Sequence, residues 1–264
     1  MRKVYLKFFS IIYLSKIWRL KTLFDSNKDV IIIMYHDLID KELFKKQMIY
    51  VKNNFNVIRL EEYIKFKKSN SNVANRSLII TFDDGYESTY SIAMPVLNEL
   101  ELEATVFVSP ALLSDYNKDL NFNFMSIEQL LEMSKCEFID IGGHTFNHVN
   151  LDKLQYNEAY KEIFEGKRFL EELLLKEINT FAYPFGKKCN YNLNTISIVR
   201  EIGFLGAVTT NRFKNGKASI YELNRVGINY RDTFEIFVAK INRFYPYKII
   251  DSITKLKKYK WGIT

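Results

Sequence analysis

The sequence contains little cysteine and no long apolar run. Its two cysteines, Cys136 and Cys189, lie outside any C-x-x-C spacing, which argues against a disulfide framework and a cysteine-ligated zinc site. No apolar run approaches the roughly 20 residues that a transmembrane helix needs. The net charge is +7, but the chain lacks a dense block of lysine and arginine, so we do not expect a nucleic-acid partner.

Residues 1–29 form a basic segment rich in aromatic residues, which we expect to be helical. Lysine and arginine interrupt the apolar side chains of residues 4–23, and no small-residue cleavage site is evident, so a cleavable signal peptide is not expected. The segment fits a helix lying on a membrane surface and equally a helix packed against the rest of the chain. A cytoplasmic or membrane-associated location is favoured, with export as the alternative.

One large α/β domain is expected over residues 30–264, with helices at its C-terminal end. The predicted strands are short, apolar and separated by helical segments. They cover residues 30–35, 77–82, 104–108, 138–143, 180–183, 204–208 and 225–228. Strands that alternate with helices favour a parallel sheet or barrel, and no repeat or linker divides the domain.

The predicted strand at 77–82 ends in two adjacent carboxylates, Asp83 and Asp84, followed by Gly85. An unpaired buried carboxylate is costly, whereas the carboxyl ends of barrel strands are where catalytic side chains gather. Neighbouring residues of an extended segment face opposite sides, so the two aspartates can have different roles. A simple Asp-Asp-Gly turn is the alternative.

The chain has only three histidines, His36, His144 and His148, and each lies just past the end of a predicted strand. Singly, each would be interpreted as a surface or core residue. Two imidazoles four residues apart and one carboxylate make a three-ligand set that leaves a position for water, as in catalytic zinc sites. Such a set accepts zinc, cobalt, nickel or iron.

Three motifs in this order resemble the polysaccharide deacetylase domain (NodB homology, carbohydrate esterase family 4). They are residues 81–85 (TFDDG), 144–148 (HTFNH) and 181–186 (FAYPFG). Residues 34–36 (MYH) resemble the permuted branch with poly-N-acetylglucosamine deacetylases, in which the catalytic histidine precedes the Asp-Asp motif. The resemblance implies a deformed (β/α) TIM-like barrel and metal-dependent hydrolysis of an N-acetyl group on a glycan.

The same resemblance implies roles for individual residues. Asp84, His144 and His148 would hold one divalent metal ion, with zinc as the first expectation. Asp83 would be the general base, and His36 the general acid that protonates the leaving amine.

The third motif implies an oxyanion and substrate pocket at Tyr183 and Phe185, with the backbone N–H of Phe185 as a donor. The family's usual arginine in this motif is replaced by Ala182. We hypothesise that Arg225 reaches Asp83 instead and tunes it; the alternative is a surface strand residue.

The sequence therefore predicts a hydrolase of non-peptide carbon–nitrogen bonds that deacetylates a cell-envelope glycan or a lipid-linked sugar. A deformylase or O-deacetylase on the same scaffold is one alternative, and a catalytically silent glycan-binding module is another. A pure binding module needs no general acid, so the three histidines and two aspartates argue against the last.

Overall fold

The computed structural model describes residues 29–116, 122–211 and 214–243. Its strands form one parallel sheet in the order β7-β6-β5-β4-β3-β1-β8, with β2 paired to β3. The strands are β1 (Ile31–Tyr35), β2 (Asn56–Val57), β3 (Ser77–Phe82), β4 (Ala104–Val108), β5 (Ile139–Gly143), β6 (Thr180–Ala182), β7 (Gly206–Val208) and β8 (Val226–Gly227).

The two ends of this sheet meet at Leu223, just before β8. The Leu223 N–H donates to the Ala207 carbonyl over 2.9 Å, and the Thr209 N–H donates to the Leu223 carbonyl over 2.7 Å. The sheet therefore curls into a barrel that is closed by a short, irregular segment. This agrees with the parallel α/β architecture expected from the alternation of strands and helices.

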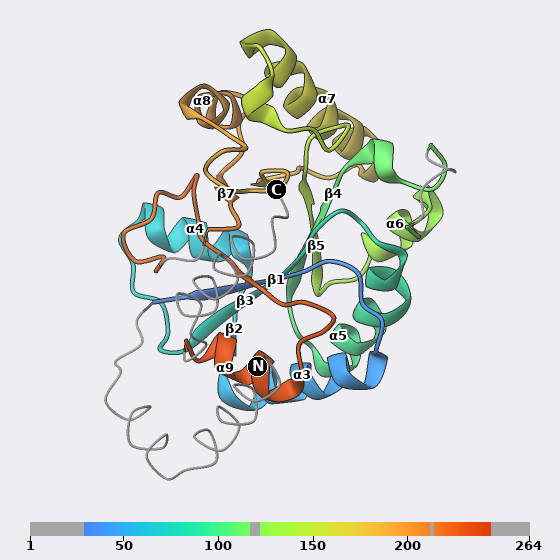
Figure 1. Ribbon diagram of the computed structural model, residues 1–264, viewed down its shortest axis with the longest axis vertical. Helices are drawn as coiled ribbons and strands as arrows, with labels where there is room; N and C mark the ends of the chain where they lie inside the picture. Colours follow the sequence, from blue (N-terminus) through green and yellow to red (C-terminus); the bar gives the residue numbers. More distant parts are fainter. Residues whose placement is uncertain (1–28, 117–121, 212–213, 244–264) are drawn as a thin grey trace, which may run out of the picture.

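Helices surround the curled sheet, with α7 and α8 on one side and α3, α5 and α9 on another (Figure 1). They are α3 (Lys41–Asn54), α4 (Leu60–Lys68), α5 (Met94–Leu100), α6 (Ile127–Met133), α7 (Tyr156–Leu174), α8 (Leu193–Glu201) and α9 (Phe234–Ile241). Short turns of helix lie at η1 (Thr89–Ala93), η2 (Pro110–Leu112) and η3 (Leu151–Lys153). Of the helices in the described ranges, none is both long and apolar enough to span a membrane.

Alternate residues of the strands pack into two separate apolar clusters. In β1, Ile31 and Ile33 belong to the outer cluster beneath the helices, while Ile32 belongs to the cluster inside the barrel. Because both faces are covered, the strands are continuously apolar instead of alternating with polar residues. Helix α4 adds Leu60 and Ile64 to the inner cluster and so fills the barrel at the amino ends of the strands.

Two helix starts show local sequence effects. Ser126 caps α6 in a capping box with Gln129. Residues 89–100 form η1 followed directly by α5, with Pro95 in the first turn of α5. Residues 1–28 and 244–264 lie outside the described part, so the proposed N-terminal segment and the last part of the 30–264 domain stay predictions.

Candidate metal and catalytic site

The sequence-predicted histidines and aspartates converge at one end of the barrel. His36 follows β1, Asp83 and Asp84 follow β3, and His144 follows β5. All of these strands are parallel, so their carboxyl ends open at the same rim.

Three candidate ligand atoms face one another at this rim. Asp84 Oδ1 lies 3.2 Å from His144 Nε2 and 3.2 Å from His148 Nε2. One ligand atom from each of the three residues lies within 4.8 Å of the others. Asp84 Oδ1 is buried, and it has no hydrogen-bond donor in a suitable geometry among the described residues. An orphaned carboxylate oxygen of this kind is costly, and a cation between the three groups would remove the cost.

A hydrogen bond on the far side of His144 prepares this ring as a ligand. His144 Nδ1 lies 2.7 Å from the Ala182 carbonyl oxygen, which can only accept, so Nδ1 carries the proton in the neutral ring. The lone pair of Nε2 then points at the Asp84 carboxylate. Two facing lone pairs repel unless a positive ion lies between them, so the residues fit a divalent metal.

The electrostatics of the cluster favour positive charge. Burial would raise the pKa of Asp84, but contacts with His144 and His148 outweigh burial and hold this pKa well below its usual range. Burial would lower the pKa of His144, but Asp84 and Asp83 raise it above its usual value. Both shifts describe a pocket that draws in a positive charge, which a metal ion supplies more strongly than a proton.

The backbone beneath the ligands is unusual. Asp84 (φ 72°), Thr145 (φ 61°) and His148 (φ 52°) all adopt left-handed conformations without being glycine. Each such residue costs about 1–3 kcal/mol and persists only where the surroundings hold it in place. The ligand geometry is therefore imposed by packing, and its supports can be identified.

Helix α7 is one such support. A Cβ added at Gly166 would lie 2.7 Å from the carbonyl carbon of Thr145, so only glycine allows this close approach. Glu162 accepts the backbone N–H of Asn147 over 2.9 Å and the Asn147 side-chain amide over 2.7 Å. Sequence reasoning missed Glu162, because no spacing rule connects a helix residue to a loop that precedes the helix.

Asp83 is held by a buried arginine. Arg225 Nη1 lies 2.6 Å from Asp83 Oδ1, and Arg225 Nη2 lies 2.7 Å from Asp83 Oδ2. Arg225 is 1% exposed and Asp83 is 2% exposed, so Arg225 is not a surface residue. Burial would raise the pKa of Asp83, but the charge and hydrogen bonds of Arg225, together with His144 and His36, outweigh burial and keep this pKa below its usual value. The pairing that the sequence hypothesis required is present; its role in tuning Asp83 stays a prediction.

His36 borders the cluster of candidate ligands from the solvent side. Its Nε2 atom lies 3.9 Å from Asp84 Oδ2, and its side chain is 46% exposed. The imidazole is therefore close to the cluster and open to an approaching substrate, which a proton donor must be.

Phe185 and Tyr183 lie in different environments. The Gly186 N–H donates to the Pro184 carbonyl over 2.7 Å, which makes Phe185 (φ 60°) the centre of a strained γ-turn. The Phe185 ring is 53% exposed, and its centroid lies 4.9 Å from that of His148. No acceptor for the Phe185 backbone N–H is found among the described residues.

The Tyr183 side chain does not line this pocket. It is fully buried, its hydroxyl donates to the Tyr221 carbonyl over 3.1 Å, and its ring stacks on Tyr191. Residues alternate between the two faces along β6, which turns Ala182 into the barrel and the Tyr183 ring into the outer core. The expectation that the Tyr183 side chain lines the substrate pocket is therefore corrected.

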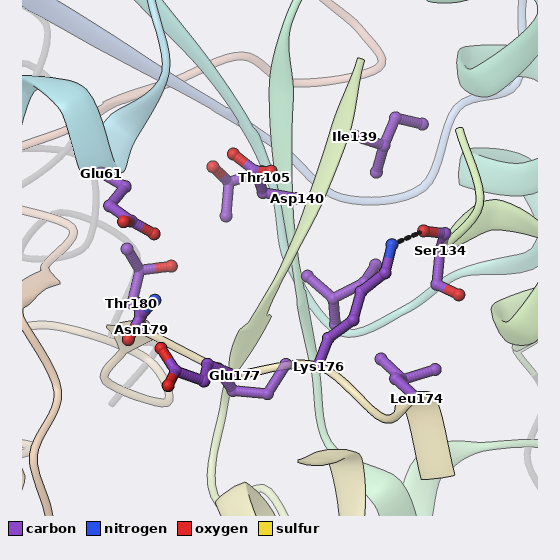
Figure 2. Close-up of a pocket in the computed structure, with 12 residues that line it drawn as sticks. Glu61, Thr105, Ser134, Ile139, Asp140, Leu174, Lys176, Glu177, Asn179 and Thr180 are labelled. Carbon is purple, nitrogen blue, oxygen red and sulfur yellow. Dashed lines mark hydrogen bonds between the residues drawn. The ribbon is translucent and has the colours of Figure 1, made fainter. Parts of the chain in front are cut away.

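A hollow at the opposite end of the barrel contains none of these residues (Figure 2). It measures about 500 Å³, including space open to solvent, and Thr105, Asp140, Thr180, Lys176 and Glu177 contribute to its lining. Lys176 reaches across it to the Ser134 carbonyl.

Barrel and site together define an α/β-barrel hydrolase. Residues 70–207, more than half of the chain, match the family described as polysaccharide deacetylase, and the chain belongs to this family. It is 26% identical over 211 residues to the Bacillus subtilis (strain 168) protein YxkH, named as a polysaccharide deacetylase, covering 75% of this chain and 71% of that one.

Two further relatives are informative. A Staphylococcus aureus (strain MRSA252) poly-beta-1,6-N-acetyl-D-glucosamine N-deacetylase is 24% identical over 217 residues, covering 78% of this chain and 73% of that protein. The structure of the Streptococcus pyogenes deacetylase PplD in complex with acetate superimposes with a TM-score of 0.71 at 24% identity, covering 81% of this chain and 98% of that one.

These matches confirm the family resemblance, the deformed (β/α) barrel of the NodB type and the hydrolase class expected from the sequence. The family is metal-dependent, and the cluster of Asp84, His144 and His148 is compatible with that property.

Proposed function

We propose that this protein is a metal-dependent deacetylase that hydrolyses the N-acetyl group of an amino-sugar glycan. The observation that carries the proposal is the convergence of Asp84, His144 and His148, with an orphaned Asp84 oxygen, beside His36 and the Asp83–Arg225 pair. The named activity of the Staphylococcus aureus relative supports an N-acetylated hexosamine polymer as the substrate class.

In this proposal Asp84, His144 and His148 hold one divalent ion. When bound, such an ion polarises the acetyl carbonyl and makes a nearby water more acidic. Two imidazole nitrogens and one carboxylate oxygen suit zinc first, while cobalt, nickel and iron also accept this set.

Asp83 acts as the general base. Arg225 keeps Asp83 ionised and fixes the plane of the carboxylate, and each Asp83 oxygen retains a further lone pair that can accept a proton. A low pKa makes a weak base, which is sufficient when the water has been made more acidic. Arg225 thus lowers the basicity of Asp83 but keeps its carboxylate ionised and fixed in orientation.

His36 acts as the general acid. The oxygen of water adds to the acetyl carbon, its proton passes to Asp83, and the carbon–nitrogen bond then breaks. An amine is a poor leaving group as an anion, so protonated His36 gives a proton to the nitrogen. The products are acetate and a free amino sugar.

The backbone N–H of Phe185 is the proposed oxyanion donor. It lies on a strained γ-turn beside His148 and has no acceptor among the described residues. A positioned donor of this kind typically lowers the barrier by about 3–4 kcal/mol. The exposed Phe185 ring is proposed to line the acetyl pocket. Peripheral membrane contact through residues 1–29 and a lipid-linked substrate stay predictions.

The proposal is tested by metal content and acetate release together. Wild-type protein should contain a single divalent ion per chain and release acetate from N-acetylated β-linked glucosamine oligomers. His144→Ala should lose both, because removing a direct ligand should cost at least as much metal affinity as losing an outer hydrogen-bond partner, which typically costs about 10–100-fold. Asp140→Asn, at the opposite end of the barrel, is the matched control and should lose neither.

Absence of metal from the wild-type protein after reconstitution with zinc or cobalt would contradict the mechanism and favour a glycan-binding module. Acetate release from O-acetylated sugars alone would instead favour an O-deacetylase.

A further inference from the structure

The loop that carries His36 has few anchors of its own. It leaves β1 at Tyr35 and enters α3, for which Asp40 is the N-cap. His36 itself is 46% exposed, so packing alone does little to fix the imidazole. The position of this ring therefore depends on how the residues next to it are held.

Ser88 holds the two residues that follow His36. The Leu38 N–H donates to Ser88 Oγ over 2.9 Å, and Ser88 Oγ donates to Asp37 Oδ1 over 2.7 Å. Ser88 and Leu38 are buried. The Ser88 hydroxyl thus uses its donor and one of its two lone pairs, and its removal would leave the Leu38 N–H without this partner.

Ser88 belongs to the segment that carries the catalytic carboxylates. It follows Asp83 and Asp84 on the loop between β3 and η1. Among the described residues, one backbone hydrogen bond also joins the two segments, from the Asp83 N–H to the Tyr35 carbonyl at 3.0 Å. Ser88 thus ties the loop of the proposed acid to the loop of the proposed base.

We propose that Ser88 is a positioning residue that sets the place of His36 relative to Asp83 and Asp84. The inference rests on the proposed function, because it assigns Ser88 to the step in which His36 protonates the leaving amine. We call the Ser88 hydrogen bonds to Leu38 and Asp37 the clamp. Loosening the clamp should slow that step and leave the metal ligands in place.

The chemistry of the leaving group separates this role from a general structural one. An amine must be protonated as the carbon–nitrogen bond breaks, whereas the phenolate of an aryl acetate leaves without an acid. Loss of the clamp should therefore affect amide hydrolysis selectively.

The experiment compares Ser88→Ala with Ser91→Ala in the metal-loaded, full-length protein. Ser91 is the matched control because it is an exposed serine of η1 that donates to Glu87 Oε2 over 3.0 Å. In Ser88→Ala, kcat on N-acetylglucosamine oligomers should fall about tenfold, with KM and 4-nitrophenyl acetate hydrolysis changing less than about twofold. Ser91→Ala should match wild type in every measurement.

Hydrogen exchange supplies a second readout that needs no activity. Amides of residues 36–40 should exchange faster in Ser88→Ala than in wild type, while residues 144–148 keep their protection. If Ser88→Ala does not fold, Asp37→Ala loosens the same clamp from an exposed position.

Unchanged exchange at residues 36–40, or an equal loss of amide and aryl ester hydrolysis, would overturn the inference. If wild type cleaves the aryl acetate but no N-acetylated oligomer, the proposed function fails, and the exchange comparison still decides whether Ser88 holds the loop.

Discussion

The two ends of the barrel each contain an aspartate paired with an arginine, yet the pairs differ in character. At the carboxyl ends of the strands, which we call the mouth, Asp83 and Arg225 are buried and make two parallel hydrogen bonds. At the opposite end, beside the hollow of Figure 2, Arg59 Nη1 lies 2.5 Å from Asp140 Oδ1 and Arg59 Nε lies 2.9 Å from Glu103 Oε1. The Arg59 and Asp140 side chains are both about one-third exposed.

The pKa values of the two aspartates move in opposite directions. Burial raises the pKa of Asp140, and Glu61 and Glu103 add to this, so that Arg59 does not restore the usual value. Asp83 has cationic neighbours instead, and its pKa is lowered despite complete burial. An Arg–Asp pair by itself therefore does not mark a catalytic site. The surrounding charges and the facing histidines distinguish the two ends.

The largest expected difference between the ends is in stability. Arg225→Ala leaves a buried carboxylate uncompensated and should lower the free energy of unfolding by about 3–5 kcal/mol. Arg59→Ala breaks a partly exposed pair and should lower it by no more than about 1 kcal/mol. Urea unfolding of the metal-free protein measures both.

Replacing both partners at the mouth, Asp83→Asn with Arg225→Met, should recover part of the stability lost in Arg225→Ala, because no unpaired charge remains. Equal losses for Arg225→Ala and Arg59→Ala would remove the distinction between the two pairs.

A smaller effect is expected from two glutamates on α7. Glu162 holds Asn147 at the mouth, whereas Glu171 Oε1 accepts the Ile178 N–H over 3.0 Å near the other end. Glu162→Ala should weaken zinc or cobalt binding about tenfold, because the strained ligand loop loses a support. Glu171→Ala should leave metal affinity unchanged, which makes it the matched control.

Competition with a chromophoric chelator measures the affinity of both glutamate variants. Similar affinity losses in the two variants would show that α7 acts through general stability and not through the ligand loop.

The smallest expected effect is in the pH dependence of stability. The lowered pKa of Asp83 contributes stability that is present above its unfolded value of about 3.9 and is lost as pH falls through the folded pKa. The raised pKa of Asp140 contributes stability that is present below about 3.9 and is lost as pH rises through the folded pKa. The two ends thus oppose each other on acidification.

Asp140→Asn should therefore make the free energy of unfolding fall more steeply as the pH drops toward about 4. Urea unfolding in the presence of a chelator tests this, because metal binding has its own pH dependence. A shallower fall in Asp140→Asn would mean that the Asp140 pKa is not raised.

Much of the candidate site could be predicted because the sequence patterns that mark it are local. Strand ends can be recognised from short apolar runs, and His36, Asp83, Asp84 and His144 each follow one. Parallel strands then bring these residues to a single rim. Tyr183 was misassigned because its position after a strand says nothing about which face its ring takes.

By itself, the sequence determined the α/β class and the strand ends, since these follow from periodicity. Residue type singled out the histidines and the two aspartates, and the family resemblance implied which of them would hold the metal. Only the tertiary structure decided which side chains hydrogen-bond to the site residues and to the loops that carry them. Arg225 meets Asp83 across 142 positions, Ser88 bonds to Leu38 across 50, and Glu162 to Asn147 across 15. Such contacts depend on how helices and loops pack around the closed sheet, because packing brings together residues that no local pattern connects.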